Sequence, residues 1–164
     1  MSLSGKSRLT TDRSLANDNF WPDVTIGDLT EKYRVPVEYA DEVISTTIKI
    51  AILQINRKLY VAKETIENQG FTSLENYALA NTDPIDDEEA LLILYSHAVC
   101  CQAKAFLLKQ AHTVQHLPTD KAAHDAQLTE DYWLTQAQSG MELLLSIVFH
   151  TDFRDPQFAT IALL

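Results

Sequence analysis

Apolar residues recur every three or four positions between residues 36 and 70, and the interior of this stretch contains no glycine or proline. Steps of three and four place side chains on one face of a helix. Pro36 suits the first turn of a helix, and Gly70 suits the position just beyond its end. The pattern predicts one long helix over residues 36–70, the central helix of an antiparallel bundle. Its main apolar stripe is Ala40, Ile44, Thr47, Ala51, Ile55, Leu59, Ala62 and Ile66.

A second line of apolar residues lies to one side of this stripe, at Val43, Ile50, Leu53 and Tyr60. A helix that is apolar on most sides is usually buried within its own bundle. The other interpretation is a subunit interface, because a second apolar face left exposed would be a sticky patch. Burial of Leu53 and Tyr60 inside a monomer would exclude the interface. Both interpretations stay open, and the four residues are the candidate subunit interface.

Two more long helices are predicted farther along the chain. One covers residues 89 to about 111, and Asp86 with Glu89 has the spacing of a capping box at its start. The other covers residues 121 to 150. Gly140 within it marks a bend or a point where another helix approaches closely, since glycine is unfavourable inside a helix.

The remaining segments complete an all-α fold. Thr25 and Asp28 form a capping-box pair for a short N-terminal helix that ends near Tyr33. Residues 1–19 are polar without periodicity and are expected to form a flexible arm, and residues 151–164 to form a C-terminal arm. We therefore predict an antiparallel helical bundle over residues 20–150, with three long helices, the short helix and flexible terminal arms.

Composition and charge narrow the function. The chain has 164 residues, of which 46% are hydrophobic, with four glycines and five prolines, as expected of one folded domain. Its net charge of −10 disfavours binding to nucleic acid, which needs clustered lysine and arginine. An acidic surface also keeps a passing DNA duplex from sticking. We expect a cytoplasmic, soluble chain, with no signal peptide and no apolar run long enough to span a bilayer.

The residues with potential chemistry are few. Cys100 and Cys101 are neighbours in a predicted helix, where adjacent side chains point apart, so we interpret them as small buried hydrophobes and not as a disulfide. His112 and His116 are four residues apart and His124 follows, which is the most metal-like feature of the chain. No glutamate stands beside His112 as in the HExxH pattern, and a solvated helix end is favoured. We assign no catalytic residue, cofactor or metal.

Several short motifs occur along the chain in a fixed order. They are the entry Phe20-Trp21-Pro22-Asp23, the long helix with Asn56 through Leu59-Tyr60, the Gly70-Phe71 turn, the Ile85-Asp86 helix start and His97-Ala98-Val99-Cys100. In this order and separation, from residue 19 to about 147, the chain resembles the head completion proteins of peduovirus-type tailed phages, part of the head-to-tail connector group.

The resemblance implies a structural role with no catalytic residues. After DNA packaging, many copies would assemble as a ring beneath the portal vertex, retain the genome and form the surface on which the tail docks. The implied partners are the portal protein, a tail completion protein and copies of the chain itself, in a ring that matches the portal symmetry. DNA would pass through the ring without sequence-specific binding, and no membrane is involved. The implied location is the head–tail junction of the virion, after synthesis in the host bacterial cytoplasm.

The apolar tail after Pro156 is expected to contact the portal, through Phe158, Ile161 and Leu163. Two alternatives belong to other classes of protein. One is a small cytoplasmic helical regulatory or interaction protein that acts as a dimer through the candidate interface. The other is a metal hydrolase on His112, His116 and His124, which zinc analysis would test.

Overall fold

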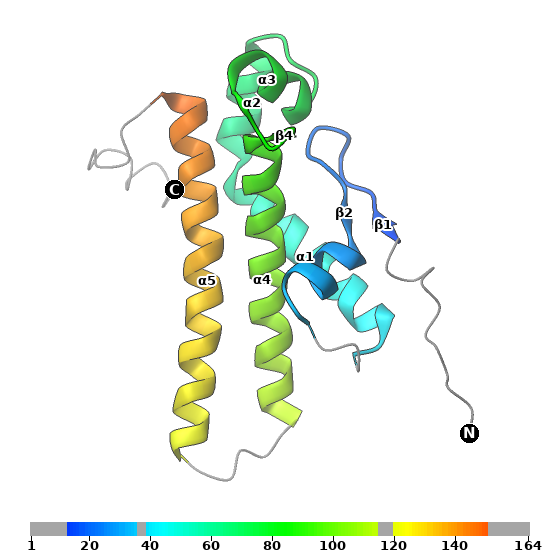
Figure 1. Ribbon diagram of the computed structural model, residues 1–164, viewed down its shortest axis with the longest axis vertical. Helices are drawn as coiled ribbons and strands as arrows, with labels where there is room; N and C mark the ends of the chain where they lie inside the picture. Colours follow the sequence, from blue (N-terminus) through cyan, green and yellow to red (C-terminus); the bar gives the residue numbers. More distant parts are fainter. Residues whose placement is uncertain (1–12, 36–38, 115–119, 151–164) are drawn as a thin grey trace.

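The structure is a computed structural model of the 164-residue chain, and it describes residues 13–35, 39–114 and 120–150. Within these ranges the side chains of residues 112–114 and 120–127 are left out. The described part is mainly helical, with four two-residue strands in two small antiparallel pairs (Figure 1). The predicted all-α class is therefore confirmed at the level of a mainly helical chain.

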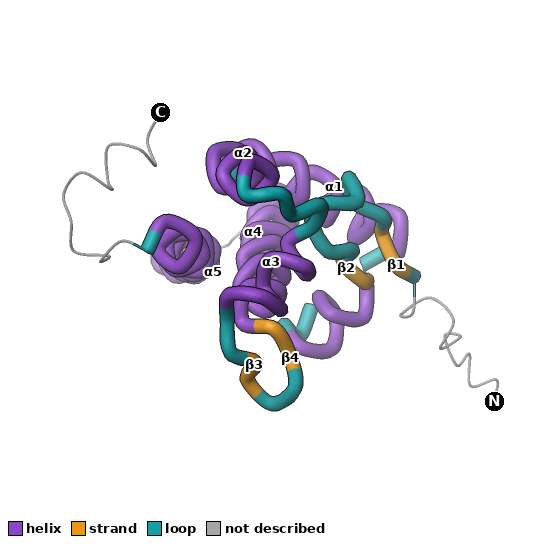
Figure 2. The backbone as a smooth tube through the Cα atoms, turned by 90° about the horizontal axis from the view of Figure 1, so that it is seen from above, coloured by secondary structure: helices purple, strands orange, loops and turns teal. Residues whose placement is uncertain are grey.

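The central helix of the fold is α4, Ala90–Val114. It runs between α5, Asp120–Phe149, on one side and α1, Asp41–Lys58, on the other, and the view from above shows the same order (Figures 1 and 2). Its apolar residues are buried on several sides. The prediction that residues 36–70 form the central helix is wrong, because α4 is the helix covered by neighbours on both flanks.

Helix α4 contradicts the expectation that no apolar run in the chain is long enough to span a bilayer. Its segment Ala90–Ala111 is long and apolar enough to cross a membrane, with a mean hydropathy of 1.6 over the qualifying window. Just over half of that window, 56%, is buried inside the protein. A helix enclosed by its own domain needs apolar residues on most sides, so burial accounts for this composition.

The stretch predicted as one helix over residues 36–70 consists of two helices. Helix α1 ends at Lys58 and α2, Tyr60–Asn68, follows after Leu59, whose φ of −92° and ψ of 10° break the regular geometry. Leu59 is fully buried at this joint. Its N–H still donates to the Ile55 carbonyl at 2.9 Å. The main apolar stripe predicted for this stretch is buried from Ile44 to Ile66, and its first member, Ala40, is exposed. Pro36 lies outside the described residues.

The predicted stop at Gly70 is confirmed. Gly70 has a φ of +93°, a left-handed conformation that favours glycine. Its N–H donates to the Glu67 carbonyl at 2.9 Å, and the Phe71 N–H donates to the Ile66 carbonyl at 3.3 Å. These two bonds form a Schellman motif. A short helix that the sequence did not suggest to us, α3 (Leu74–Asn81), follows and is capped by the Ser73 hydroxyl, which accepts from the Asn76 N–H.

The predicted capping box at Asp86 and Glu89 is wrong. Strands β3 (Pro84–Ile85) and β4 (Glu88–Glu89) pair as a hairpin, and Asp86 and Asp87 form its two-residue turn. Their φ values of 52° and 62° are both positive, as a type I′ turn requires. Helix α4 begins at Ala90 directly after the second strand.

The N-terminal segment is tied to the body earlier than predicted. Strand β1 (Ser14–Leu15) pairs with β2 (Val24–Thr25), and the Leu15 side chain is buried. Residues 13–19, expected in the arm, thus belong to the fold. The capping box is confirmed, because the Asp28 N–H donates to Thr25 Oγ1 at 3.0 Å and the Thr25 N–H to Asp28 Oδ2 at 3.1 Å. The short helix after it continues as the π-helix η2, Asp28–Lys32.

Helix α5 packs closely on α4 at Gly140. A methyl group at this position would lie 3.4 Å from His97 Cδ2 and from the Leu94 carbonyl oxygen. Farther along the same contact, Lys104 Nζ lies 3.9 Å from the centre of the Trp133 ring and donates to the Tyr33 carbonyl at 2.6 Å. Gly140 is therefore a point of close helix approach, one of the two roles predicted for it.

Candidate assembly surface

The outer side of α1 presents exposed apolar side chains. Ile44, Ile48 and Ile55 turn inward and are almost completely buried, whereas Leu53 is 70% exposed on the opposite side. We call the exposed set the α1 stripe, and it consists of Val43, Ile50 and Leu53 on α1 with Tyr60 and Val61 at the start of α2. Leu53 and Tyr60 stay exposed in the described part of the chain, so the described helices do not bury this face and the subunit interface remains a prediction.

Basic residues flank the α1 stripe. Lys49 and Arg57 lie four residues before and four residues after Leu53, so all three share one face of the helix. Both basic residues are exposed. Tyr60 at the joint donates its hydroxyl hydrogen to Glu64 Oε1 at 2.7 Å. The stripe therefore has an apolar centre with positive charges beside it and a carboxylate toward each end, Glu42 (paired with Arg13 at 3.1 Å) and Glu64.

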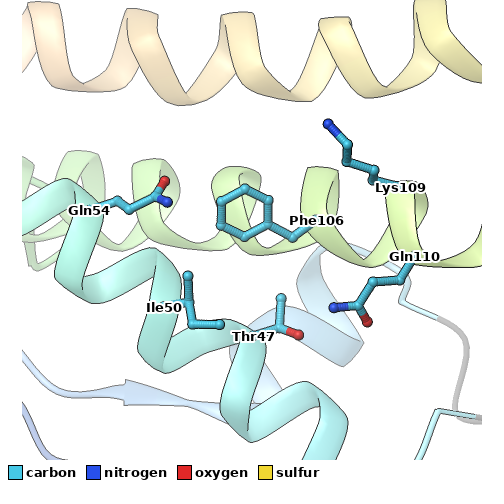
Figure 3. Close-up of a pocket in the computed structure, with 6 residues that line it drawn as sticks. All are labelled: Thr47, Ile50, Gln54, Phe106, Lys109 and Gln110. Atoms are coloured by element: carbon cyan, nitrogen blue, oxygen red, sulfur yellow. The ribbon is translucent and has the colours of Figure 1, made fainter.

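A shallow groove continues from the stripe into the space between α1 and α4. It has a volume of about 420 Å³ and is lined by Thr47, Ile50, Gln54, Phe106, Lys109 and Gln110 (Figure 3). Phe106 is half-buried and provides an apolar wall from α4, while Lys109 forms an ion pair with Glu130 of α5 at 3.5 Å. The groove is open to solvent and is large enough for a side chain.

A second group of exposed apolar residues lies on α5, with the polar residues Thr135 and Ser139 between its members on the same face. Leu128, Tyr132 and Leu143 are about half exposed, and their spacing of 4 and 11 residues places them on one helical face. We call these three residues the α5 stripe. Asp131 and Glu142 precede Tyr132 and Leu143 by one residue, so the carboxylates follow one edge of the same face.

The polar cluster around His97 does not have the properties of a catalytic thiol site. Tyr33 Oη lies 2.7 Å from His97 Nδ1, and Cys101 Sγ lies 3.5 Å from His97 Nε2. Burial raises the pKa of the Cys101 thiol to about 12 and lowers the pKa of His97. At neutral pH both groups are therefore uncharged, and no thiolate–imidazolium pair forms.

A second pocket, of about 670 Å³, is lined in part by the β3–β4 hairpin. Its lining includes carboxylates from three segments, among them Asp28, Glu75 and Glu88, together with Leu92 and Ile93 of α4. Asp28 is already bridged by Lys32 at 2.9 Å. Burial opposes ionisation of Asp28, but hydrogen bonds from Lys32 and Thr25 outweigh it and lower the pKa of the carboxyl.

Other predicted site residues lie outside what the structure describes. The expected portal contacts Phe158, Ile161 and Leu163 are in residues 151–164, which are not described. The side chains of His112, His116 and His124 also lie outside the described part of the chain. In the described part of the chain, no three or more histidine, cysteine, aspartate or glutamate residues are grouped so as to hold a metal ion.

The sequence matches the model of the family described as "Phage head completion protein (GPL)" over residues 15–145, which is most of the chain. The chain belongs to this family. It is also similar to the "Probable head completion/stabilization protein" of Haemophilus phage HP1 (strain HP1c1), with 23% identity over 112 residues, 68% of this chain and 73% of that protein. No solved structure matches it. The predicted resemblance is confirmed, and the family is structural and not an enzyme family.

The sequence predicted the α1 stripe better than the α5 stripe. Four of the five residues of the α1 stripe were predicted from helical spacing, and Val61 was missed. Phe106 was missed because it lies off the main apolar line of α4. The α5 stripe had a signal in the spacing of Leu128, Tyr132 and Leu143, but that spacing alone did not separate an exposed face from a buried one.

Proposed function

We propose that this head completion protein is a connector subunit that assembles as a ring on the portal after DNA packaging, retains the genome and provides the docking surface for the tail. Family membership supports a structural role in the phage head. The name of the Haemophilus phage relative includes stabilisation, which fits the retention of packaged DNA.

The proposal of a ring rests on the exposed α1 stripe. Leu53 and Tyr60 are more than half exposed, and Ile50 of the same stripe lines the groove beside Phe106. Exposed apolar side chains gathered on one face are typical of a surface that contacts another protein. In a ring, every copy would bury this patch against its neighbour.

Charge supports the passage of DNA through the ring. The chain has 23 acidic and 13 basic residues. Like charge between the protein and the phosphates keeps the duplex from adhering to the channel wall. The proposed partners remain the portal protein, the tail completion protein and further copies of the chain, and the tail residues Phe158, Ile161 and Leu163 are the proposed portal contact.

Complementation of a phage that lacks this gene tests the proposal. We expect that heads made without the protein package DNA but lose it and do not join tails, and that the wild-type protein restores both steps. Heads that keep DNA and join tails without the protein would refute the function. A chain truncated after Pro156 tests the portal contact, because normal retention and joining by the truncated chain would remove that assignment.

A further inference from the structure

The two exposed stripes are complementary in charge. Along α1 the apolar centre at Leu53 is accompanied by Lys49 and Arg57. Residues 122–153 of the sequence contain no lysine or arginine, and the exposed face of α5 within this range carries Asp131 and Glu142. The centre of the α1 stripe is thus apolar and basic, with Glu42 and Glu64 toward its ends, and the exposed face of α5 is apolar and acidic.

The two stripes are of comparable length and lie on different sides of the molecule. At about 1.5 Å per residue, residues 128 to 143 extend over about 22 Å, and residues 43 to 53 over about 15 Å before α2 extends the stripe. Lys49 and Arg57 are about 12 Å apart along the helix axis, and Asp131 and Glu142 are about 16 Å apart. Helix α4 separates α1 from α5 in both views of the fold (Figures 1 and 2).

We infer that neighbouring copies of this chain join the α1 stripe of one copy to the α5 stripe of the next. This inference rests on the proposed ring and names the two faces that form it. Leu53 packs against Tyr132 and its neighbours, while Lys49 and Arg57 face Asp131 and Glu142. Because the contact uses two different faces, each copy binds one neighbour through its α1 stripe and the other through its α5 stripe. Repetition of such a contact closes a ring when the rotation from copy to copy adds up to a full turn.

Mixing two variants, each with one damaged face, tests the inference. Leu53→Asp damages the α1 stripe, and Tyr132→Asp damages the α5 stripe. Both positions are exposed, so the fold should survive, and circular dichroism checks this. Each variant alone should fail to form higher oligomers, whereas their 1:1 mixture should form a heterodimer and stop there, as measured by native mass spectrometry. Unchanged self-association of either variant, or a mixture without heterodimers under conditions where the wild type associates, would overturn it.

If the wild-type chain associates only on the head, cross-linking in phage particles tests the same pairing of the two stripes. Cys100 and Cys101 are buried and burial raises their pKa values, so an added surface cysteine reacts selectively. The double variant Leu53→Cys/Tyr132→Cys should give a ladder of covalent oligomers with a short bismaleimide. Leu53→Cys alone and the control Leu53→Cys/Leu79→Cys, with Leu79 63% exposed on α3, should not.

The outcomes separate the inference from the proposed function. Particles that are complete but contain no ladder, or an equally strong cross-link through Leu53→Cys alone, would overturn the pairing of the stripes and leave the function intact. Heads that mature without the protein would refute the function itself.

Discussion

Trp21 stacks on Tyr95 with the two rings nearly parallel, their centres 5.0 Å apart and their planes 7° apart. The Tyr95 hydroxyl donates to Asn56 Oδ1 at 2.6 Å and accepts from Asn17 Nδ2 at 2.7 Å. Asn56 Nδ2 donates in turn to Asn17 Oδ1 at 2.9 Å, which closes a ring of three hydrogen bonds. This single contact joins the N-terminal segment, α1 and α4, and thereby positions the helix that carries the α1 stripe.

Tyr95→Phe should destabilise the protein measurably. The substitution keeps the aromatic stack but leaves the side-chain amides of Asn17 and Asn56 each without one partner, which costs about 1–3 kcal/mol in a buried setting. Urea unfolding followed by tryptophan fluorescence measures the change. Tyr60→Phe is the matched control, because it removes a tyrosine hydroxyl bonded to an exposed glutamate and should leave the unfolding midpoint unchanged. Equal midpoints for wild type and Tyr95→Phe would contradict the role of the network.

Gly70→Ala should destabilise the end of α2 by about 1–2 kcal/mol, the cost of a left-handed conformation for a residue with a Cβ. Nothing lies within 4 Å of the added methyl group, so the loss comes from the backbone conformation and not from a clash. Gly70→Asn should lose less, because asparagine tolerates this conformation better. Thermal unfolding of the two variants should rank alanine below asparagine, and the reverse order would contradict the explanation.

Position 140 should accept alanine and reject leucine. The added methyl group would make ordinary contacts at 3.4 to 3.6 Å with α4, and alanine is favoured over glycine inside a helix by about 1 kcal/mol. Gly140→Ala should therefore keep or raise the free energy of unfolding. Gly140→Leu should lower it by about 1–3 kcal/mol, because the larger side chain overfills the contact between α4 and α5. Chemical denaturation of both variants checks the pair, and tolerance of leucine would show a looser contact.

His97 should make stability depend on pH in the mildly acidic range. Burial holds its pKa in the folded protein below the ordinary value of 6.5. As the pH falls below about 6.5, the unfolded chain binds a proton that the folded chain does not, so the free energy of unfolding decreases until the pH passes the folded pKa. Urea midpoints of wild type and His97→Gln between pH 8 and pH 5 measure this. The wild type should lose more stability across the range, and parallel curves would contradict the prediction.

Local rules of the sequence determined several elements of this protein. The Thr25–Asp28 capping box forms as its spacing predicts, since both partners lie within one helical turn. Gly70 ends its helix because a left-handed residue is needed there and glycine adopts that conformation without a Cβ penalty. The helical periodicity likewise identified the stretches that became α1, α4 and α5, and the order of short motifs indicated the family.

Only the tertiary structure decided which helix is central, where the long stretch breaks and which apolar face stays exposed. Leu59 interrupts the helix while it is fully buried, so packing around it and not its own propensity sets the joint. Asp86 is a residue type that often caps a helix, yet the pairing of the flanking strands β3 and β4 places it in a turn. Leu53 and Ile55 are both apolar residues of one helix, and only the position of α4 leaves the first exposed and the second buried. Periodicity specifies the faces of a helix, whereas burial depends on which other segments pack against each face.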